Sequence, residues 1–197
     1  MILMKTGRVY IVRHGNTFDK GETLLRVGGK TDLPLSISGR EQAKALATHF
    51  AGVSFQQAYS SDLNRTRQTA EAILDGQAFE LAHFLTEIDY GPDEGQPEDK
   101  VIARLGQSAL DEWDQHAVPP KDWHVDPDAL RTAWQAFLAN CSPGTNTLVV
   151  TSNGVARFLL DVVEVNQDVP RKLRTGAYGT IDLTPKGPVL TSWDVRP

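Results

Sequence analysis

Residues 8–17 of the chain read RVYIVRHGNT, an apolar run that stops abruptly in a polar turn. The short β-branched run of residues 8–13 is typical of a strand that is buried on both faces of a sheet. The turn places His14 and Gly15 directly after the last strand residue, Arg13. The stretch therefore predicts a buried strand that carries a charged side chain and a ring nitrogen at its carboxyl end.

Predicted strands recur along the chain and alternate with predicted helices. Apolar or alternating runs indicate further strands at residues 57–60, 79–82, 147–151, 177–183 and 189–193. Cap residues indicate helices that begin at Ser38, after Asp62 and at Asp126-Pro127, and Glu41 completes a capping box with Ser38. The apolar run of residues 155–163 indicates one more helix. The alternation predicts an α/β protein, a three-layer α/β/α sandwich with a mostly parallel sheet.

The composition fits one domain. The chain has 197 residues, of which 40% are hydrophobic, and its formal net charge is −5. A chain of this length buries enough surface to fold alone, so we expect a single domain of residues 1–197. The acidic balance disfavours a general nucleic-acid-binding protein, because such proteins need a basic face.

Two further features bear on where the protein works. The single cysteine, Cys141, excludes an intrachain disulfide and fits a reducing compartment. No apolar run approaches the roughly 20 residues that span a bilayer, and the apolar stretch within residues 1–6 is too short for the core of a signal peptide. We therefore expect a soluble, cytoplasmic protein that binds neither membranes nor nucleic acids. Its oligomeric state is left open.

Arg13 and His14 are the first candidates for chemistry, because ligands of parallel sheets bind at the carboxyl ends of the strands. A buried arginine is costly unless it meets an anion. A histidine beside it can be held neutral, with a ring nitrogen free to act as a nucleophile. The alternative is a solvated pair at a strand end. A second polar turn, residues 151–154 (TSNG), follows another predicted strand and belongs to the same edge.

Arg65 and Glu87 are two further candidates. Arg65 lies in the first turn of the helix predicted after Asp62, where unpaired N–H groups and the helix dipole attract anions. The alternative for Arg65 is a place on a solvated helix face. Glu87 follows the third predicted strand, and a carboxyl group there could protonate a leaving oxygen. We expect the neighbouring acids to belong to a solvated loop; these are Asp93, Glu94, Glu98 and Asp99.

Four ordered blocks of sequence carry a resemblance to a known family. They are residues 12–17 (VRHGNT), 29–43 (GKTDLPLSISGREQA), 60–70 (SSDLNRTRQTA) and 85–95 (LTEIDYGPDEG). The blocks resemble the signatures of the histidine phosphatase superfamily, the phosphoglycerate-mutase-like group with an Arg-His-Gly motif. A lone Arg-His-Gly is a weak signal, but four blocks in order are specific. The resemblance resumes near Thr147, and nothing specific matches between Gln96 and Asn146.

The resemblance implies a mechanism and one addition to the fold. His14 is expected to attack phosphorus in line and become a phosphohistidine, while Arg13 and Arg65 neutralise the equatorial oxygens. Glu87 is expected to protonate the leaving oxygen and then to take a proton from the attacking water. No metal or cofactor is expected, since guanidinium groups supply the positive charge. Residues 96–146 are expected to form a small helical cap insertion over the strand ends.

The chain departs from the family pattern at one position. The family's usual block, Val-Val-Ser-His-Gly-Gly, carries a second pocket histidine, whereas residues 149–154 here read VVTSNG and place Ser152 at the histidine position. Loss of such a donor typically costs about 3 kcal/mol, or roughly 100-fold in rate. Three outcomes are open. Ser152 or Asn153 donates the missing hydrogen bond, another histidine fills in (His83, His116 or His124), or only a phosphate-binding pocket remains.

The predicted substrate is a small phosphomonoester, and an active phosphatase is favoured because Glu87 has little purpose in a pocket that only binds an anion. Asn16 is placed to touch the phosphate or the substrate, and Arg26 could meet a second anionic group. Trp113 and Trp123 could stack on a substrate ring, but we expect them to be packing anchors. A phosphoglycerate-type mutase is the remaining alternative, for which the chain is short and the cap small.

Overall fold

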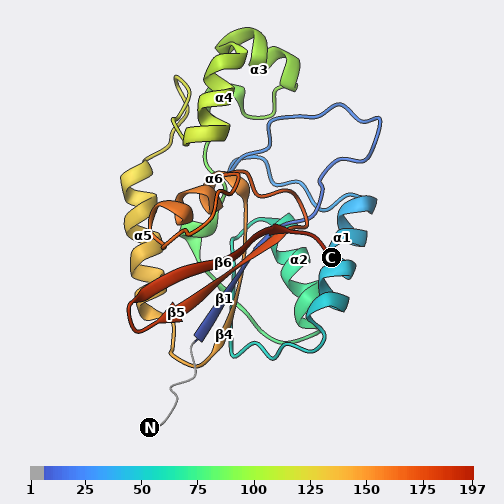
Figure 1. Ribbon diagram of the computed structural model, residues 1–197. Coiled ribbons are helices and arrows are strands. Elements are labelled where there is room, and N and C mark those ends of the chain that lie inside the picture. Colours follow the sequence, from blue (N-terminus) through green and yellow to red (C-terminus); the bar gives the residue numbers. More distant parts are fainter. Residues whose placement is uncertain (1–6) are drawn as a thin grey trace.

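A mixed six-stranded sheet forms the centre of the computed structural model, which describes residues 7–197. The strands lie in the order β3-β2-β4-β1-β5-β6, of which β4, β1, β5 and β6 are labelled in Figure 1. Their bounds are Gly7–Arg13 (β1), Gln57–Ser60 (β2), Glu80–Leu81 (β3), Asn146–Thr151 (β4), Tyr178–Thr184 (β5) and Gly187–Val195 (β6). β3, β2, β4 and β1 run parallel, whereas β5 is antiparallel to both β1 and β6. The sheet is therefore mostly parallel, as the sequence predicts.

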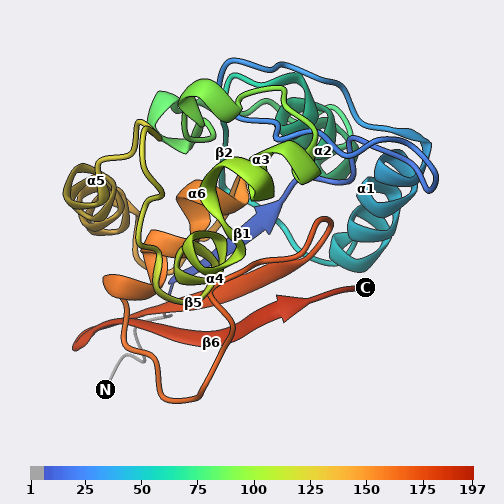
Figure 2. The same ribbon diagram turned by 90° about the horizontal axis from the view of Figure 1, so that it is seen from above.

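Helices cover both faces of the sheet, which confirms the predicted three layers. The α-helices are Ile37–Phe50 (α1), Asn64–Leu74 (α2), Glu98–Leu105 (α3), Gln107–His116 (α4), Pro127–Asn140 (α5) and Asn153–Ala156 (α6). Short 3-10 helices are His83–Leu85 (η1), Gly91–Asp93 (η2) and Arg157–Asp161 (η3). α1 and α2 pack on one face, and α5, α6 and η3 pack on the other (Figures 1 and 2).

The alternation of side chains along β1 explains these two layers. Val9 and Ile11 point into the core that contains Trp134 of α5. Val12 points to the opposite face, into the core that contains Leu46 of α1. All three strand residues are fully buried, which is why the strand is continuously apolar instead of alternating with polar residues. Packing on both faces fixes the carboxyl end of β1, where the polar turn begins.

One helix begins two residues earlier than the sequence predicts. Ser36, and not Ser38, is the N-cap of α1 and accepts a hydrogen bond from the N–H of Gly39 at 3.1 Å. The carboxylate of Asp19 accepts hydrogen bonds from the N–H groups of Ile37 and Ser38, at 3.1 and 2.9 Å. A partner from the preceding loop therefore satisfies the first turn, which local sequence spacing does not reveal.

The other helix ends differ in how well their caps are predicted. α2 starts after Leu63 without a side-chain cap, and the expected cap residue Asp62 instead pairs with the Nδ1 of His83 at 3.0 Å. At α5 the prediction is confirmed, because Asp126 accepts a hydrogen bond from the N–H of Ala129 at 2.9 Å. The apolar segment 155–163, predicted as one helix, instead contains the end of α6 and the whole of the 3-10 helix η3.

The segment expected to form the cap, residues 96–146, divides into two parts in the structure. α3 and α4 stand above the carboxyl ends of the strands (Figure 1). α5 instead packs beside the sheet, where the Nε1 of Trp134 donates a hydrogen bond to the carbonyl oxygen of Val155 at 3.0 Å. Because the apolar face of α5 joins the core, the part of the chain that can cover a ligand is smaller than the predicted bounds.

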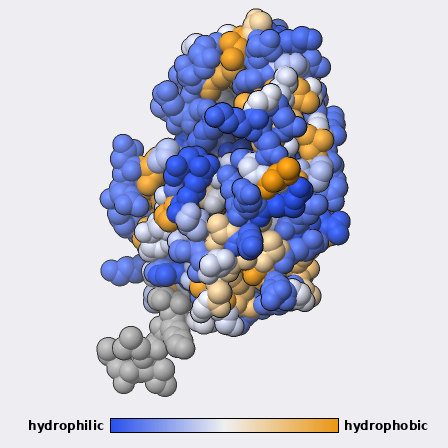
Figure 3. Space-filling view, turned by 90° about the vertical axis from the view of Figure 1, so that its right-hand side faces the viewer, coloured by the Kyte–Doolittle hydropathy of each residue, from blue (hydrophilic) through white to orange (hydrophobic). Residues whose placement is uncertain are grey.

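The surface on the side of α1 is mostly hydrophilic, and its hydrophobic side chains form small separate groups (Figure 3). Within residues 7–197, no helix combines the length and apolar character that crossing a bilayer requires. Residues 1–6, on which the expectation about a signal peptide falls, lie outside the described residues.

Candidate active site

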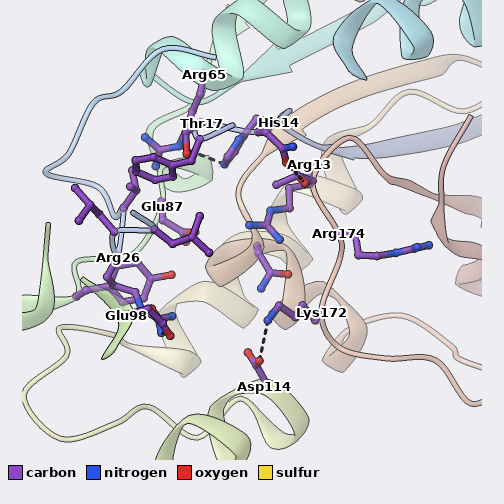
Figure 4. Close-up of a pocket in the computed structure, with 18 of the residues that line it drawn as sticks. Arg13, His14, Thr17, Arg26, Arg65, Glu87, Glu98, Asp114, Lys172 and Arg174 are labelled. Atoms are coloured by element: carbon purple, nitrogen blue, oxygen red, sulfur yellow. Dashed lines mark hydrogen bonds and ion pairs between the residues drawn. The ribbon is translucent and has the colours of Figure 1, made fainter. Parts of the chain in front are cut away.

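A cavity of about 530 Å³ opens at the carboxyl ends of β1 and β4, and residues of the cap helix α4 line one side of it; Figure 4 shows its labelled residues. Within the described chain, seven basic side chains and three acidic ones line it, an excess of four positive charges in a protein whose net charge is −5. The basic residues are Arg13, Arg26, Arg65, Arg157, Lys172, Arg174 and Arg196, and the acids are Glu87, Glu98 and Asp114. Such a concentration of charge favours an anionic ligand.

His14 follows β1 directly and is held by backbone and ring contacts. Its N–H donates a hydrogen bond to the carbonyl oxygen of Thr151 at 3.2 Å, which ties the end of β1 to the end of β4. The ring Nδ1 lies 2.7 Å from the carbonyl oxygen of Gly15. A carbonyl oxygen only accepts, so Nδ1 carries the proton and Nε2 carries the lone pair. The imidazole is thus oriented with its basic nitrogen toward the cavity side where Arg65 lies.

The charge state of His14 follows from the same surroundings. Only 6% of the residue is exposed. Burial, and then the positive charges of Arg65 and Arg13, hold the pKa of His14 well below its usual range. The ring is therefore neutral at neutral pH, as predicted, which is the form that can act as a nucleophile.

Arg65 lies on the inner side of α2 and is fully buried, so the alternative of a solvated helix face is wrong. Its Nη1 donates to the carbonyl oxygen of Thr31 at 2.9 Å, and its Nη2 donates to that of Gly28 at 3.1 Å. Its Nε donates to the Nε2 of His14 at 3.2 Å (Figure 4). The expectation of a free ring nitrogen is therefore not met: this contact has to open before Nε2 can attack another atom.

Arg13 is the second cation of the site and is half-buried. Its Nη1 donates to the carbonyl oxygen of Leu173 at 2.7 Å, and its Nε is buried without a hydrogen-bond partner in the described part of the chain. Burial is the main cause that lowers the pKa of both Arg13 and Arg65. Neither guanidinium forms an ion pair with a carboxylate of residues 7–197. A buried charge without a counter-ion is costly, so the pair is arranged to receive an anion.

Glu87 faces this pair across the cavity (Figure 4). Only 7% of the residue is exposed. Its Oε1 accepts a hydrogen bond from the N–H of Ile88 at 3.0 Å, and its Oε2 accepts one from the N–H of Gly154 at 3.3 Å. A Cβ on Gly154 would lie 2.2 Å from Oε1. The glycine of the TSNG turn is therefore what allows the carboxylate to sit against the end of β4.

Two of the other predicted ligand residues line the cavity with polar groups already engaged. Asn16 donates from Nδ2 to the Oγ of Ser38 at 3.1 Å, and its Oδ1 accepts from the Oγ1 of Thr175 at 2.5 Å. The Oδ1 of Asn153 accepts from the N–H of Leu173 at 2.8 Å. Both asparagines thus join the loop after β1 and the end of β4 to the segment that precedes β5. Their contact with a phosphate stays a prediction.

Arg26 and Ser152 lie in different surroundings. Arg26 lines the cavity, forms an ion pair with Glu98, and lies 5.3 Å from the ring centroid of Tyr90. Ser152 is fully buried, its Oγ has no hydrogen-bond partner among the described residues, and it is not among the residues that line the cavity. In this conformation the serine hydroxyl does not reach the cavity surface, because it is covered by its neighbours.

The histidines considered as replacements for the missing one lie elsewhere. His83 is exposed and pairs with Asp62, and His124 is exposed and pairs with Asp89 at 2.7 Å. His116 ends α4 on the surface. None of these three lines the cavity, so of the three outcomes left open by the sequence, the one in which another histidine fills in is not met in this structure.

The acids expected in a solvated loop have structural roles, with the exception of Asp99, which is exposed. Glu94 accepts hydrogen bonds from the N–H groups of Gly28 and Lys30, both at 3.0 Å, and so shapes the loop whose carbonyl groups hold Arg65. Asp93 is 2% exposed and accepts from the Nε1 of Trp123 at 2.7 Å. Glu98 lines the cavity. These partners come from distant segments, which is why spacing alone suggested a solvated loop.

Arg157 is a cavity residue that the sequence analysis does not identify. It is 1% exposed, and its guanidinium carbon lies 3.9 Å from the centroid of the Trp113 ring. The signal was present as a single charged residue inside the apolar run 155–160. Trp113 and Trp123 themselves are buried and pack on each other at 5.5 Å, as expected of packing anchors.

Fold and site together define a class: an α/β protein with a neutral histidine and two uncompensated arginines at the carboxyl edge of its sheet. The chain belongs to the histidine phosphatase superfamily (branch 1), whose family model matches residues 9–196. This confirms the resemblance found in the four sequence blocks.

Individual relatives cover the chain to different extents. It is 38% identical over 93 residues to mouse fructose-2,6-bisphosphatase TIGAR. The match covers 44% of this chain and 34% of that protein. It is 44% identical over 66 residues to "probable phosphoglycerate mutase GpmB" of Escherichia coli. That match covers 34% of this chain and 30% of GpmB. Each match thus spans about a third of the relative. The α-ribazole phosphatase of Shigella flexneri has a similar structure, with a TM-score of 0.71, 25% identity and 96% coverage of both chains.

Proposed function

We propose that the protein is a phosphatase that hydrolyses a small phosphomonoester through a phosphohistidine on His14, without a metal ion. One observation carries the proposal: a neutral histidine touches the buried guanidinium of Arg65 beside the half-buried guanidinium of Arg13, and neither guanidinium forms an ion pair with a carboxylate in the described chain. An anion with two or three oxygens satisfies such a pair bidentately. The family and its named phosphatase members support the same class of reaction.

The first step is transfer of the phosphoryl group to His14. The phosphate oxygens take the hydrogen bonds of Arg65 and Arg13, so that Arg65 releases Nε2 of the histidine. Nε2 then attacks phosphorus, the bond between phosphorus and the leaving oxygen breaks, and that oxygen takes the proton of the Glu87 carboxyl group. Positive charge on the two arginines stabilises the equatorial oxygens, where charge accumulates in the transition state.

The second step returns the enzyme to its starting state. A water molecule attacks the phosphohistidine and gives its proton to the Glu87 carboxylate. The bond between Nε2 and phosphorus breaks, and inorganic phosphate leaves with the added oxygen. Throughout, the hydrogen bond from Nδ1 to the carbonyl oxygen of Gly15 stabilises the charge that forms on the ring.

A second candidate function is a protein that binds a phosphorylated ligand without turning it over. Ser152 favours it, because the serine supplies neither the charge nor the reach of the family's second histidine. The presence of Glu87 beside the arginines favours the phosphatase, since an acidic side chain weakens the binding of an anion, whereas its protonated carboxyl group can give a proton to the leaving oxygen. A mutase is a third arrangement, for which GpmB is the relevant relative.

The decisive measurement is turnover of p-nitrophenyl phosphate in EDTA by the wild type and by His14→Ala. We expect turnover by the wild type, no turnover above background by the variant, and an acid-labile, base-stable phosphoryl group trapped on the wild type alone. Equal rates in the two proteins would exclude His14 as the nucleophile. Binding of inorganic phosphate by a wild type that does not turn over would support the binding protein. Transfer between phosphoglycerates that exceeds phosphate release would support the mutase.

A further inference from the structure

Glu94 accepts hydrogen bonds from four donors that surround its carboxylate. Its Oε1 accepts from the N–H groups of Gly28 and Lys30, both at 3.0 Å, and from the hydroxyl of Thr31 at 2.8 Å. Its Oε2 accepts from the N–H of Tyr90 at 3.1 Å. Glu94 is half-buried and is not among the residues that line the cavity, so any effect of Glu94 on a ligand there passes through its neighbours.

Residues 28–31 form a turn around this carboxylate. The N–H of Thr31 donates to the carbonyl oxygen of Gly28 at 3.4 Å, which closes the turn. A Cβ on Gly28 would lie 2.2 Å from the Oε2 of Glu94 and 2.6 Å from the carbonyl oxygen of Ile88, so the close approach requires glycine. Three donors of the turn converge on one oxygen, as in the backbone nests that bind anions. Removal of the carboxylate leaves all three without this partner, which favours a different shape of the turn.

The outer side of the same turn holds Arg65, which is labelled in Figure 4. The carbonyl oxygens of Thr31 and Gly28 accept from its Nη1 and Nη2, at 2.9 and 3.1 Å. The N–H of Gly29, which shares a peptide unit with the Gly28 carbonyl, donates to the carbonyl oxygen of Ile88 at 2.9 Å. Because the N–H and C=O of a planar trans peptide point in opposite directions, this bond aims the Gly28 carbonyl at the guanidinium. The turn takes two of the five N–H donors of Arg65 and leaves the others, Nε among them, for the reaction.

The segment that carries the turn also carries the proposed acid. A Cβ on Gly29 would lie 2.5 Å from the carbonyl oxygen of Glu87, so the turn rests on the backbone of the acid. Glu94 follows on the same segment, after the 3-10 helix η2. Arg65 comes from α2 and donates to no carboxylate of residues 7–197, so the neutral carbonyl groups of the turn fix its direction.

We propose that Glu94 is a positioning residue, which fixes the turn of residues 28–31 and through it the direction of the Arg65 guanidinium toward the phosphate. The proposal rests on the phosphatase function of the cavity, in which Arg65 stabilises the equatorial oxygens of the transferred group. Misplacement of such a group by about 1 Å lowers the rate about 100-fold. Glu94 thus controls the rate without touching the substrate.

The test is a double-mutant cycle between Glu94 and Arg65, measured as kcat/KM for p-nitrophenyl phosphate. In the wild-type background we expect Glu94→Ala to lower kcat/KM about 100-fold, because the turn loses its anion. We expect Glu94→Gln to lower it about tenfold, since the amide oxygen still accepts from the turn but carries no charge. In the Arg65→Lys background each change should lower kcat/KM by less than about threefold, because the guanidinium that Glu94 positions is already absent.

The cycle separates positioning from a general loss of structure. A residue that only stabilises the fold lowers kcat/KM by the same factor in both backgrounds. Equal factors in the two backgrounds, or losses below about threefold for both Glu94 variants in the wild-type background, would overturn the proposal. Urea unfolding shows which variants are folded. If Glu94→Ala does not fold, Glu94→Gln decides by the same comparison.

Two further comparisons test whether Glu94 acts through Arg65 and not as a proton donor. Glu94→Gln should lower kcat/KM by the same factor for p-nitrophenyl phosphate and for an alkyl phosphate, whereas loss of a proton donor harms the alkyl phosphate more. A loss confined to the alkyl phosphate would overturn the positioning role. Glu71→Gln makes the matched change on the exposed side of α2 and is expected to keep the kcat/KM of each background.

Calorimetric binding of inorganic phosphate distinguishes a failure of the positioning role from a failure of the proposed function. If the wild type binds phosphate but hydrolyses no phosphomonoester, the phosphatase proposal fails and the same cycle is measured in dissociation constants. Binding that is about tenfold weaker in Glu94→Ala, but unchanged by the same substitution in the Arg65→Lys background, supports the positioning role without any turnover. Equal weakening in both backgrounds, or no weakening in either, rejects it.

Discussion

The two ends of the cavity hold their positive charges in different ways. At the reacting end, Arg65 is buried and Arg13 is half-buried, and the two donate only to carbonyl oxygens and to His14. At the cap end, the basic groups are already matched by acids: Arg26 with Glu98, and Lys172 and Arg157 with Asp114. Uncompensated burial is expensive, whereas exposed pairs contribute little.

This difference assigns phosphate binding to the reacting end of the cavity and selectivity for the leaving group to the cap end. At the reacting end, Glu87 acts on both guanidinium groups from across the cavity but forms no ion pair with either in the described chain, so a phosphomonoester can take their hydrogen bonds. The cap end is neutralised in advance, so a ligand has to exchange one anion for another, and the net gain is small and depends on the shape and charge of the leaving group. Changes at the reacting end should therefore have large effects on every substrate, and changes at the cap end small effects on some.

The largest expected effect comes from Arg65. A lysine in its place cannot donate at once to Thr31, Gly28 and a phosphate oxygen. We expect Arg65→Lys to lower kcat/KM for p-nitrophenyl phosphate about 10³-fold, the upper range for loss of one preorganised donor. Arg67→Lys, on the exposed side of the same helix, serves as the control and should be unchanged. A loss below tenfold would mean that the two ends of the cavity do not differ as described.

Glu87 tests whether the reacting end does more than bind. As a general acid it matters most for a poor leaving group. Glu87→Gln should lower kcat for an alkyl phosphate about 100-fold and for p-nitrophenyl phosphate much less, because nitrophenolate leaves without a proton. The measurement is kcat across a series of leaving groups. An equal loss for all of them would assign Glu87 a purely structural role.

The sequence predicts the reacting end better than the cap end for a physical reason. Arg13 ends a strand that packing fixes on both faces, and His14 follows it directly. Glu87 lies two residues after η1, so the positions of all three depend on regular structure. The sheet and its layers are predictable on the same grounds. What spacing cannot show is which distant group satisfies a given atom. Asp19 at the start of α1 and Glu94 under the Arg65 loop are examples.

The cap end depends on contacts between segments that no local pattern relates. Arg157 becomes a cavity residue only because Trp113 of α4 lies on its guanidinium. Lys172 acquires its partner only where the segment before β5 passes α4. Ser152 could be recognised as a departure from the family block, but not that its hydroxyl is enclosed, since that depends on the packing around the end of β4.

Variants at Ser152 test whether the reacting end lacks a hydrogen-bond donor. Restoring the imidazole with Ser152→His should raise kcat by about 10- to 100-fold, because it supplies the donor that the reacting end lacks. The same change should lower the free energy of unfolding by about 1–3 kcal/mol, since the site is fully buried. Kinetics and urea unfolding measure the two effects separately.

The control at this position is Ser152→Ala. Because the serine Oγ has no partner in the described chain and does not line the cavity, we expect the alanine variant to keep the wild-type kcat and stability. A tenfold loss of kcat in Ser152→Ala would show instead that the hydroxyl turns to the phosphate during the reaction. An unchanged kcat in Ser152→His would show that the reacting end already has a substitute for the histidine.

The smallest expected effect concerns the charge state of His14. Burial, and then the charges of Arg65 and Arg13, lower its pKa well below the usual range, whereas the unfolded chain takes up the proton near the ordinary value of about 6.5. The unfolded state therefore binds more protons below that pH, and the free energy of unfolding falls as pH drops through about 6.5. Between about pH 7.5 and 5.5, urea unfolding should show the wild type losing about 1 kcal/mol more than His14→Gln.

The matched control is His83→Gln, which removes a histidine ring from an exposed position outside the cavity. The comparison bears on the reacting end, because burial and then the positive charges of Arg65 and Arg13 lower the pKa of His14. If His14→Gln and the wild type lose stability equally on acidification, the folded protein protonates the ring near the ordinary pKa. Burial and the charges of Arg65 and Arg13 would then not depress the pKa of His14 as described, and a larger share of the ring would be protonated near neutral pH, where it cannot attack phosphorus.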